Sequence, residues 1–322
     1  MKKELFKSLV STTVVLLFVC IAIWYVVANH DDFAKIAITD PLYLVPALLF
    51  LTINIYGAGV VIDLATEPHG IKLKRQEAFG LAAITRFTNQ LSPSYISATV
   101  RATYLKKTYG VSYTKFSSSF IISNLLQFMI SGVFAIVTFF ALEKLSTYND
   151  SALITVGVVV IFFLSLLNLP VSRLRHLIEK EGAKNNRLLE RLRELLDGYE
   201  TVRSHPKLLP RTVLWMLVNI TALGATYFFL YASLGSHLNV VNVFFISSLT
   251  TWSVLFAITP GSLGVREGLM VLAAQIAGVP IAPTLVVAIL LRLLTFILAG
   301  VLSSYYTPKL LHTSIFKLSS KS

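Results

Sequence analysis

The sequence predicts an all-α polytopic membrane protein with about six full spans and two re-entrant helical hairpins in an inverted-topology repeat, countable as about eight hydrophobic segments. First, only 14% of its 322 residues are charged, whereas a soluble domain has roughly a quarter. Second, the uncharged runs reach the length of about 20 residues that crosses a membrane. Third, proline, glycine and hydroxyl residues interrupt two of the apolar regions. We therefore expect a single membrane domain over residues 1–322.

The uncharged runs place the expected spans in order along the chain. They cover approximately residues 8–28, 41–62, 116–142, 151–171, 212–234 and 283–306. The first span follows the basic start M-K-K-E-L-F-K and is longer than the apolar core of a signal peptide, which has about 7–15 residues. We therefore expect it to be a retained helix. It contains Cys20, the single cysteine of the chain, so an internal disulfide is excluded.

The region 78–115 decides the topology, because polar residues are scattered among its apolar ones and basic residues gather towards its end. These basic residues are Arg101, Lys106, Lys107 and Lys115. If the region crossed the membrane once, they would lie opposite the basic segment 63–77. If it dips in and returns, both groups lie on the same side. Because Lys and Arg concentrate on the cytoplasmic side, we predict a re-entrant hairpin that enters from there.

A second re-entrant hairpin is expected at about 241–279, where I-T-P-G-S-L-G-V-R-E-G interrupts an apolar region. With both termini cytoplasmic, this topology places 23 of the 28 basic residues inside and two outside. The remaining three, Arg86, Arg266 and Arg292, lie within membrane segments. This asymmetry predicts the orientation of an integral protein of the cytoplasmic membrane.

The basic segment of about 173–211 is expected to be a cytoplasmic amphipathic connector. Leu188, Leu192, Leu195 and Tyr199 form an apolar stripe at helical spacing, with arginines among them. Such a helix would lie on anionic lipid. It would alternatively pack against the inner face of the protein itself, and the sequence leaves both interpretations open.

The topology divides the chain into inverted halves, about 1–145 and 146–322, each reading span, span, hairpin, span. A short similarity supports this division. S-P-S-Y-I-S at residues 92–97 and T-P-G-S-L-G at residues 259–264 share one order of residue types: hydroxyl, proline, small, any, branched aliphatic, small. They lie 167 positions apart, which is about half the chain.

The breaks at Pro93 and Pro260 free backbone amides, which the membrane interior tolerates only beside a cavity or a protein partner. A half-helix that restarts after such a break directs its positive N-terminal end at that cavity, where an anion is favoured. Gly261 and Gly264 would allow a ligand or another helix to approach the backbone closely.

The charged residues within the membrane segments mark a candidate substrate site, since each costs a few kcal/mol in hydrocarbon. Two interpretations stay open. Glu267 forms a structural ion pair with Arg292 or Arg86, or the arginines bind an anionic group while Glu267 balances charge, binds a cationic part of the substrate or carries a proton. The candidate residues are Arg266, Glu267, Gly261, Gly264, Arg86, Arg101, Arg292, Asn89, Pro93 and Pro260. Asn124 and Gln127 share one helical face and would either line the same cavity or join two helices.

The sequence offers no catalytic constellation. Its six histidines show no metal-ligand spacing, and it contains no nucleophile motif or phosphate loop. Segments between the expected spans do not exceed about 40 residues, which is too short for a soluble catalytic domain. We therefore expect a protein that is not an enzyme and has no metal, cofactor or catalytic residue. The net charge of +12 comes from positions that flank the membrane, so nucleic acid is not an expected partner.

Two motifs resemble the membrane region of the lysylphosphatidylglycerol synthase/flippase family, also called the multiple peptide resistance factor family. T-P-G-S-L-G-V-R-E-G at residues 259–268 is similar to the signature Pro-Gly-Gly-x-Gly-x-Arg-Glu-Gly of that family. R-F-T-N-Q-L-S-P-S-Y-I-S-A-T-V-R at residues 86–101 is similar to its Asn-x-x-x-Pro-x-x-x-Gly-x-x-x-Arg region, with Ser97 near an expected glycine. Full-length members append an aminoacyl-transferase domain, and we expect this chain to be a stand-alone membrane member.

The resemblance implies a translocator that moves phospholipids or other lipid-linked anionic substrates between leaflets. Its expected partners are membrane phospholipids, anionic or aminoacylated, and a second copy of the chain in a homo-oligomer. Two alternatives stay open: a transporter of a small anionic solute, and a membrane subunit of a lipid-modifying transferase, for which Glu267 and Asp63 are the available acids or bases.

Overall fold

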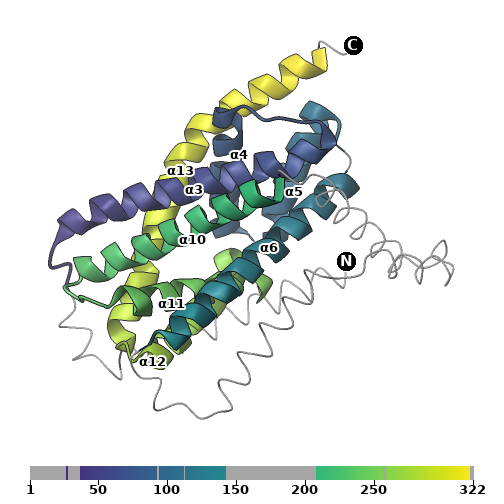
Figure 1. Ribbon diagram of the computed structural model, residues 1–322. Coiled ribbons are helices and arrows are strands. Elements are labelled where there is room, and N and C mark those ends of the chain that lie inside the picture. The colour runs from purple at the N-terminus through teal and green to yellow at the C-terminus, as the bar shows by residue number, and fades with distance from the viewer. Residues whose placement is uncertain are drawn as a thin grey trace, which may run out of the picture.

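A computed structural model describes residues 37–92, 94–111, 113–142, 208–256 and 259–319, together with Val27. The described residues form helices joined by short turns (Figure 1). Helices long and apolar enough to cross a membrane cover Pro41–His69, Ser119–Phe140, Leu208–Ser233 and Ile281–Leu310. They correspond to four of the expected spans, so the predicted all-α polytopic membrane class is confirmed. The expected spans 8–28 and 151–171 lie outside the described residues, as does the connector apart from residues 208–211.

Two antiparallel helices form the centre of the molecule. They are α3 (Leu44–Thr66) and α10 (Leu208–Ser233), which lie side by side along their lengths (Figure 1). At one end the backbone amides of Thr39 and Asp40 donate to the carbonyl oxygen of Ser233, at 2.8 and 3.2 Å. At the other end Arg211 forms an exposed ion pair of 3.1 Å with Glu67. The start of α3 therefore lies beside the end of α10, and the end of α3 lies beside the start of α10. The two helices run in opposite directions, as the predicted topology requires.

The first hairpin consists of α4 (Arg75–Leu91) and α5 (Ser94–Tyr109). Its two arms are joined at their base by Glu77, a buried residue whose carboxylate accepts hydrogen bonds from the hydroxyls of Tyr104 and Tyr109 at 2.6–2.7 Å. The end of α5 therefore returns to the level at which α4 began. This brings Lys106 and Lys107 to the same end of the molecule as the basic start of α4, in agreement with the predicted re-entrant hairpin.

The second hairpin consists of α11 (Val240–Thr251), the short 3-10 helices η5 (Trp252–Phe256) and η6 (Pro260–Ser262), and α12 (Val265–Ala277). Each hairpin is followed by a long helix: α6 (Tyr113–Phe140) after the first and α13 (Ile281–Ser319) after the second. The last expected span, about 283–306, lies within α13, which continues through Pro308 to Ser319. Proline leaves the carbonyl of Ser304 without its helical donor.

Two apolar clusters occupy opposite ends of the molecule. One joins α3, α4, α5 and the start of α6 with Leu310 of α13. The other joins the start of α3 and the ends of α6 and α10 with α11, α12 and the first turns of α13. We call the first end the basic end, because most of the described Lys and Arg residues gather there. They are Lys72, Lys74, Arg75, Lys106, Lys107, Lys115, Arg211 and Lys309.

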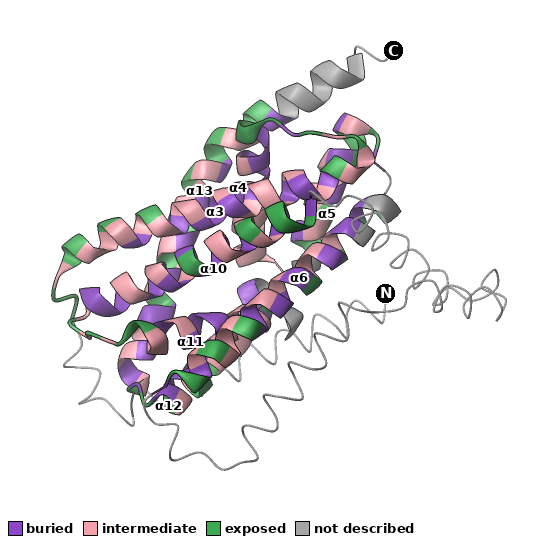
Figure 2. Ribbon diagram, viewed as in Figure 1, coloured by how far each residue is buried: buried purple, intermediate pink, exposed green. Residues whose placement is uncertain are grey.

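Large apolar side chains are exposed along the outward faces of α6 and α13, the surface expected of helices that face lipid (Figure 2). They include Leu125, Val133, Val137, Ile289, Leu293, Ile297 and Val301. Buried residues instead gather where the helices face one another (Figure 2).

The two halves of the chain show corresponding helix contacts, and each hairpin also packs on a helix of the other half. The packing of α3 on α4 corresponds to that of α10 on α11, and the packing of α4 on α13 corresponds to that of α11 on α6. The hairpins therefore enter from opposite ends, and each packs on the long helix that ends the other half. This exchange is the relationship that inverted halves produce. The boundary between the halves, near residue 145, falls outside the described residues and stays a prediction.

Gly59 and Gly224 occupy matching positions, 165 residues apart, on α3 and α10. A Cβ at Gly59 would lie 2.8 Å from the carbonyl oxygen of Ala78 on α4. A Cβ at Gly224 would lie 2.8 Å from the ring of Phe244 on α11. Each glycine thus allows the first arm of a hairpin to approach its central helix.

Gly59→Ala is expected to lower the free energy of unfolding by about 1–3 kcal/mol, because the backbone that its Cβ meets cannot move away cheaply. Thermal unfolding of the purified protein in detergent would measure this loss. Gly268→Ala is the matched control, since a Cβ at that helical position meets no atom within 4 Å. Equal melting temperatures for the two variants would contradict the close α3–α4 packing.

Single cysteines in a Cys20→Ser background test the hairpin geometry. Lys72→Cys and Lys107→Cys are expected to react with a membrane-impermeant thiol reagent from the same side, because both lie at the basic end. Ser236→Cys, at the opposite end, should react from the other side. The charge rule predicts that the basic end faces the cytoplasm. Labelling of Lys72→Cys and Lys107→Cys from different sides would overturn the re-entrant hairpin.

Candidate functional site

The tips of the two hairpins meet between the apolar clusters. Here η6 contacts both α4 and α5. Its backbone is tightly turned, with positive φ at Gly261 (58°), Ser262 (54°) and Gly264 (87°). A Cβ at Gly261 would lie 2.8 Å from the side-chain oxygen of Gln90 and 2.9 Å from Arg292. Glycine is therefore required at this position by both conformation and space.

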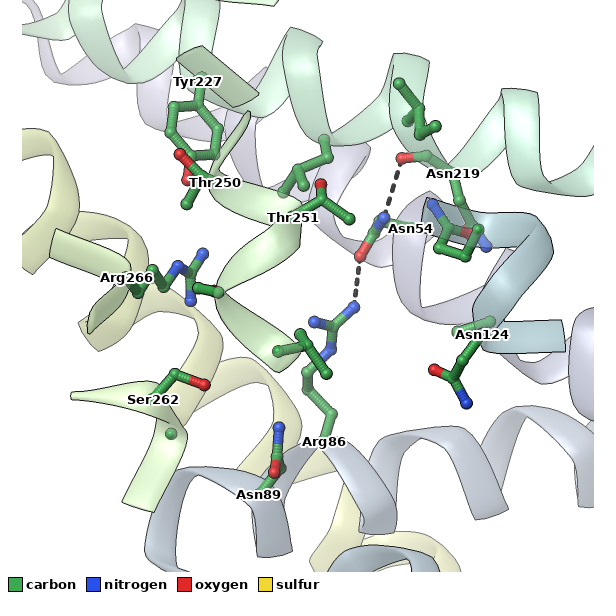
Figure 3. Close-up of a pocket in the computed structure, with 17 residues that line it drawn as sticks. Asn54, Arg86, Asn89, Asn124, Asn219, Tyr227, Thr250, Thr251, Ser262 and Arg266 are labelled. Carbon is green, nitrogen blue, oxygen red and sulfur yellow. Dashed lines mark hydrogen bonds between the residues drawn. The ribbon is translucent and has the colours of Figure 1, made fainter. Parts of the chain in front are cut away.

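A polar cavity of about 280 Å³ opens beside this contact (Figure 3). Side chains from both hairpins and from the central helices surround it, with Arg86 and Arg266 directed into it from different hairpins (Figure 3). Polar lining residues include Asn54, Asn89, Asn124, Gln127, Asn219, Tyr227, Thr250, Thr251, Ser253 and Ser262. Arg86 and Asn89 also line a second cavity of about 550 Å³, so the two spaces share a wall.

Arg101 adds a second positive charge to the second cavity, beside that of Arg86. Its guanidinium carbon lies 4.4 Å from the ring centroid of Phe120, a cation–π contact. Its Nε atom is buried without a hydrogen-bond partner. Arg101 also lines a small third space of about 130 Å³ together with Asn124 and Gln127. The second cavity, of about 550 Å³, lies within the range of about 300–1,000 Å³ that is typical of small-molecule sites, the first is just below that range and the third is well below it.

The charge of these cavities is one-sided. Three arginines line them, and the described lining residues include no aspartate or glutamate. Arg86 and Arg266 line the same cavity, so two like charges face one space. The N-terminus of α12, just before Arg266, adds partial positive charge. Such an arrangement favours an anion that neutralises the arginines.

A chain of amide hydrogen bonds holds Arg86. Its Nη2 donates to Oδ1 of Asn54 at 2.5 Å, and Nδ2 of Asn54 donates to the carbonyl oxygen of Asn219 at 2.9 Å (Figure 3). The central helices thus fix the direction of the guanidinium through neutral partners. Because no carboxylate takes part in this chain, Arg86 keeps its full charge available to a ligand.

Glu267 and Arg292 form an ion pair with each other. Oε1 of Glu267 lies 2.6 Å from Nη2 of Arg292, and their side chains are only 8% and 22% exposed. Oε2 of Glu267 accepts from the backbone amide of Gly264 at 2.7 Å, and Arg292 also donates to the carbonyl of Gly261 at 3.2 Å. Of the two interpretations from the sequence, the ion pair between Glu267 and Arg292 agrees with this geometry. The pair fastens the tip of the second hairpin to α13.

The comparison with protein families covers nearly the whole chain. Residues 7–303 match the family described as the lysylphosphatidylglycerol synthase TM region. The chain belongs to this family. It is therefore an integral membrane protein, as its apolar helices indicate. A search of curated proteins gives no match.

Within this family member, the structure brings most of the predicted site residues together. Arg86, Arg266, Asn89 and Gly261 line the first cavity, and Arg101 lines the second. Asn124 and Gln127 line the cavities too, in agreement with the first of their two interpretations. Gly264 is the N-cap of α12, Pro260 begins η6, and Pro93 lies outside the described residues. Asp63 accepts from the backbone amide of Leu73 at 2.7 Å, away from the cavities.

Asn54 and Asn219 are site residues that the sequence analysis missed, because each lies inside an apolar span without a break. A usable signal exists: Asn54 and Gly59 match Asn219 and Gly224 at the same separation of 165 positions. This separation is close to that of the two hairpin motifs. Aligning the central helices with the hairpins would therefore have identified both asparagines. Tyr227, Thr250 and Ser262 have no comparable signal.

The ion pair is expected to stabilise the fold. Arg292→Ala leaves Glu267 buried without its cation, and loss of one partner of a buried pair costs up to about 3–5 kcal/mol. Replacing both residues by glutamine removes the unpaired charge and should cost less. Thermal unfolding of Arg292→Ala, of Glu267→Gln and of the variant with glutamine at both positions measures the order of their stabilities. A double variant less stable than Arg292→Ala would contradict the pairing.

Proposed function

We propose that the protein is a flippase-like translocator of phospholipids or other lipid-linked anionic substrates in the cytoplasmic membrane. The observation that carries the proposal is the polar cavity between the hairpin tips, lined by arginines and by no described carboxylate. Membership of the lysylphosphatidylglycerol synthase TM region family supports a role at the membrane.

Arg86 and Arg266 together bind the phosphate of the headgroup in this proposal. Guanidinium groups donate two parallel hydrogen bonds to phosphate oxygens, and two arginines from different hairpins can contact opposite sides of one phosphate. The bound phosphate in turn offsets the like charges of the two arginines that face this cavity. Arg101 offers a further phosphate contact in the adjoining cavity.

The position of the site suits movement between leaflets. The hairpins enter from opposite ends, and their tips enclose the cavity between two apolar clusters. A headgroup held there is distant from both ends of the molecule. Small rotations of one half against the other would open the cavity towards one end and then the other, which is the mode of transport that inverted repeats support.

Arg266→Ala is expected to slow lipid translocation at least about tenfold, since one charge-assisted hydrogen bond contributes about 1.5–3 kcal/mol. The assay uses proteoliposomes with fluorescent phospholipids labelled on the acyl chain, whose outward-facing fraction is quenched by a reagent that cannot cross the membrane. Arg86→Ala is expected to act alike. Arg266→Lys should retain part of the rate, because it keeps the charge and loses the bidentate geometry.

Arg211→Ala is the matched control, because it removes an arginine from an exposed ion pair remote from the cavity. Exposed pairs contribute about 0–1 kcal/mol, so its rate should equal that of wild type. Equal lipid translocation rates for wild type and Arg266→Ala would contradict the assignment of Arg266 to the phosphate site. Transport of a small anion without lipid movement would favour a solute transporter instead.

A further inference from the structure

We infer that the transported headgroup is a net-negative phosphate bearing neutral hydroxyls, such as a glycerol or sugar phosphate, and that it carries no amine. The inference rests on the proposed function and deepens it, since it selects one class among the anionic and aminoacylated lipids. It depends on three features of the cavities: their charge, the engagement of the nearby carboxylates and the chemistry of the neutral lining groups.

The charge of the cavities opposes an ammonium group. Arg86, Arg101 and Arg266 line two adjoining spaces without a described acidic residue. An aminoacyl group would bring further positive charge beside them, and like charges in a medium of low dielectric repel strongly. A headgroup with a single phosphate and no amine avoids this repulsion and neutralises part of the cationic charge.

The nearby carboxylates are already engaged. Both oxygens of Glu267 are used, one by Arg292 and one by the amide of Gly264. Both oxygens of Glu77 accept from tyrosine hydroxyls at the base of the first hairpin, and Asp63 accepts from Leu73. None of these three residues lines the cavities. The described part of the site therefore offers no anion with which to bind the amine of a substrate.

The neutral lining groups instead suit hydroxyls. Five carboxamides line the first cavity, from Asn54, Asn89, Asn124, Gln127 and Asn219. An amide presents donors and an acceptor on one flat group, which matches a hydroxyl that both donates and accepts. The Oδ1 atoms of Asn89 and Asn219 are buried without a hydrogen-bond partner. A substrate hydroxyl would satisfy each of them without adding charge.

The test compares three acyl-labelled lipids in proteoliposomes of phosphatidylcholine: phosphatidylglycerol, phosphatidylethanolamine and lysylphosphatidylglycerol. Their glycerol backbones and labels match, so the headgroup is the only variable. Wild-type protein is expected to move phosphatidylglycerol about tenfold faster than either amine-bearing lipid. Equal rates for all three, or a preference for an amine-bearing lipid, would overturn the inference while leaving the proposed function intact.

A matched pair of variants tests the cause of the selectivity. Gln127→Glu places a carboxylate in the cavities, and Gln76→Glu makes the same change at an exposed position in the first turn of α4. Gln127→Glu is expected to lower the translocation rate of phosphatidylglycerol. It should also reduce the ratio of that rate to the translocation rate of lysylphosphatidylglycerol. Gln76→Glu should leave both rates at their wild-type values. Asn124→Asp repeats the cavity change if Gln127→Glu fails to fold, and unchanged selectivity in the folded cavity variant would overturn the inference.

Two further outcomes separate this inference from the proposed function. If wild-type protein moves none of the lipids, the proposed function itself fails. Radiolabelled glycerol 3-phosphate distinguishes a lipid headgroup from the free anion of the same chemistry. Its uptake into vesicles without lipid movement would assign the cavity to the soluble anion and overturn both proposals, whereas lipid movement without uptake supports a headgroup.

Discussion

The contact between the two hairpin tips is the feature on which the rest of the structure depends. A helix that breaks inside a membrane must satisfy its freed backbone groups within the protein. Here each break lies against the other hairpin, and Glu267 and Arg292 fasten η6 to α13 with hydrogen bonds to its backbone. The cavity exists because these tips approach each other without filling the space between them.

Much of the fold could be predicted from the sequence, because membrane physics limits the choices. Apolar length identifies the spans, and the distribution of lysine and arginine required the region 78–115 to return to its starting side. The hydrogen bonds that the hydroxyls of Tyr104 and Tyr109 donate to Glu77 show that α5 ends at the level where α4 begins. The continuation of α13 past Pro308 could not be predicted, because a proline in the interior of a helix usually breaks or kinks it.

The site was predicted less completely, for a physical reason. Charges in an apolar segment are costly and therefore stand out, so the arginines were identified. Whether each charge meets a partner is a question of geometry, and sequence left the pairing of Glu267 open. Only the packing shows that Arg292 is engaged while Arg86 is held by neutral Asn54. Asparagines in a span cost less than charges and so give a weaker signal.

The two halves share a backbone plan but differ in the charges that they contribute. Arg86 and Arg101 both come from the first hairpin, whereas Arg266 comes from the second and Arg292 is engaged in an ion pair. The charges that line the cavities are therefore divided unequally, with two arginines from the first hairpin and one from the second. In the proposed translocation, this inequality gives an anion a different electrostatic environment in the half of the site formed by each hairpin.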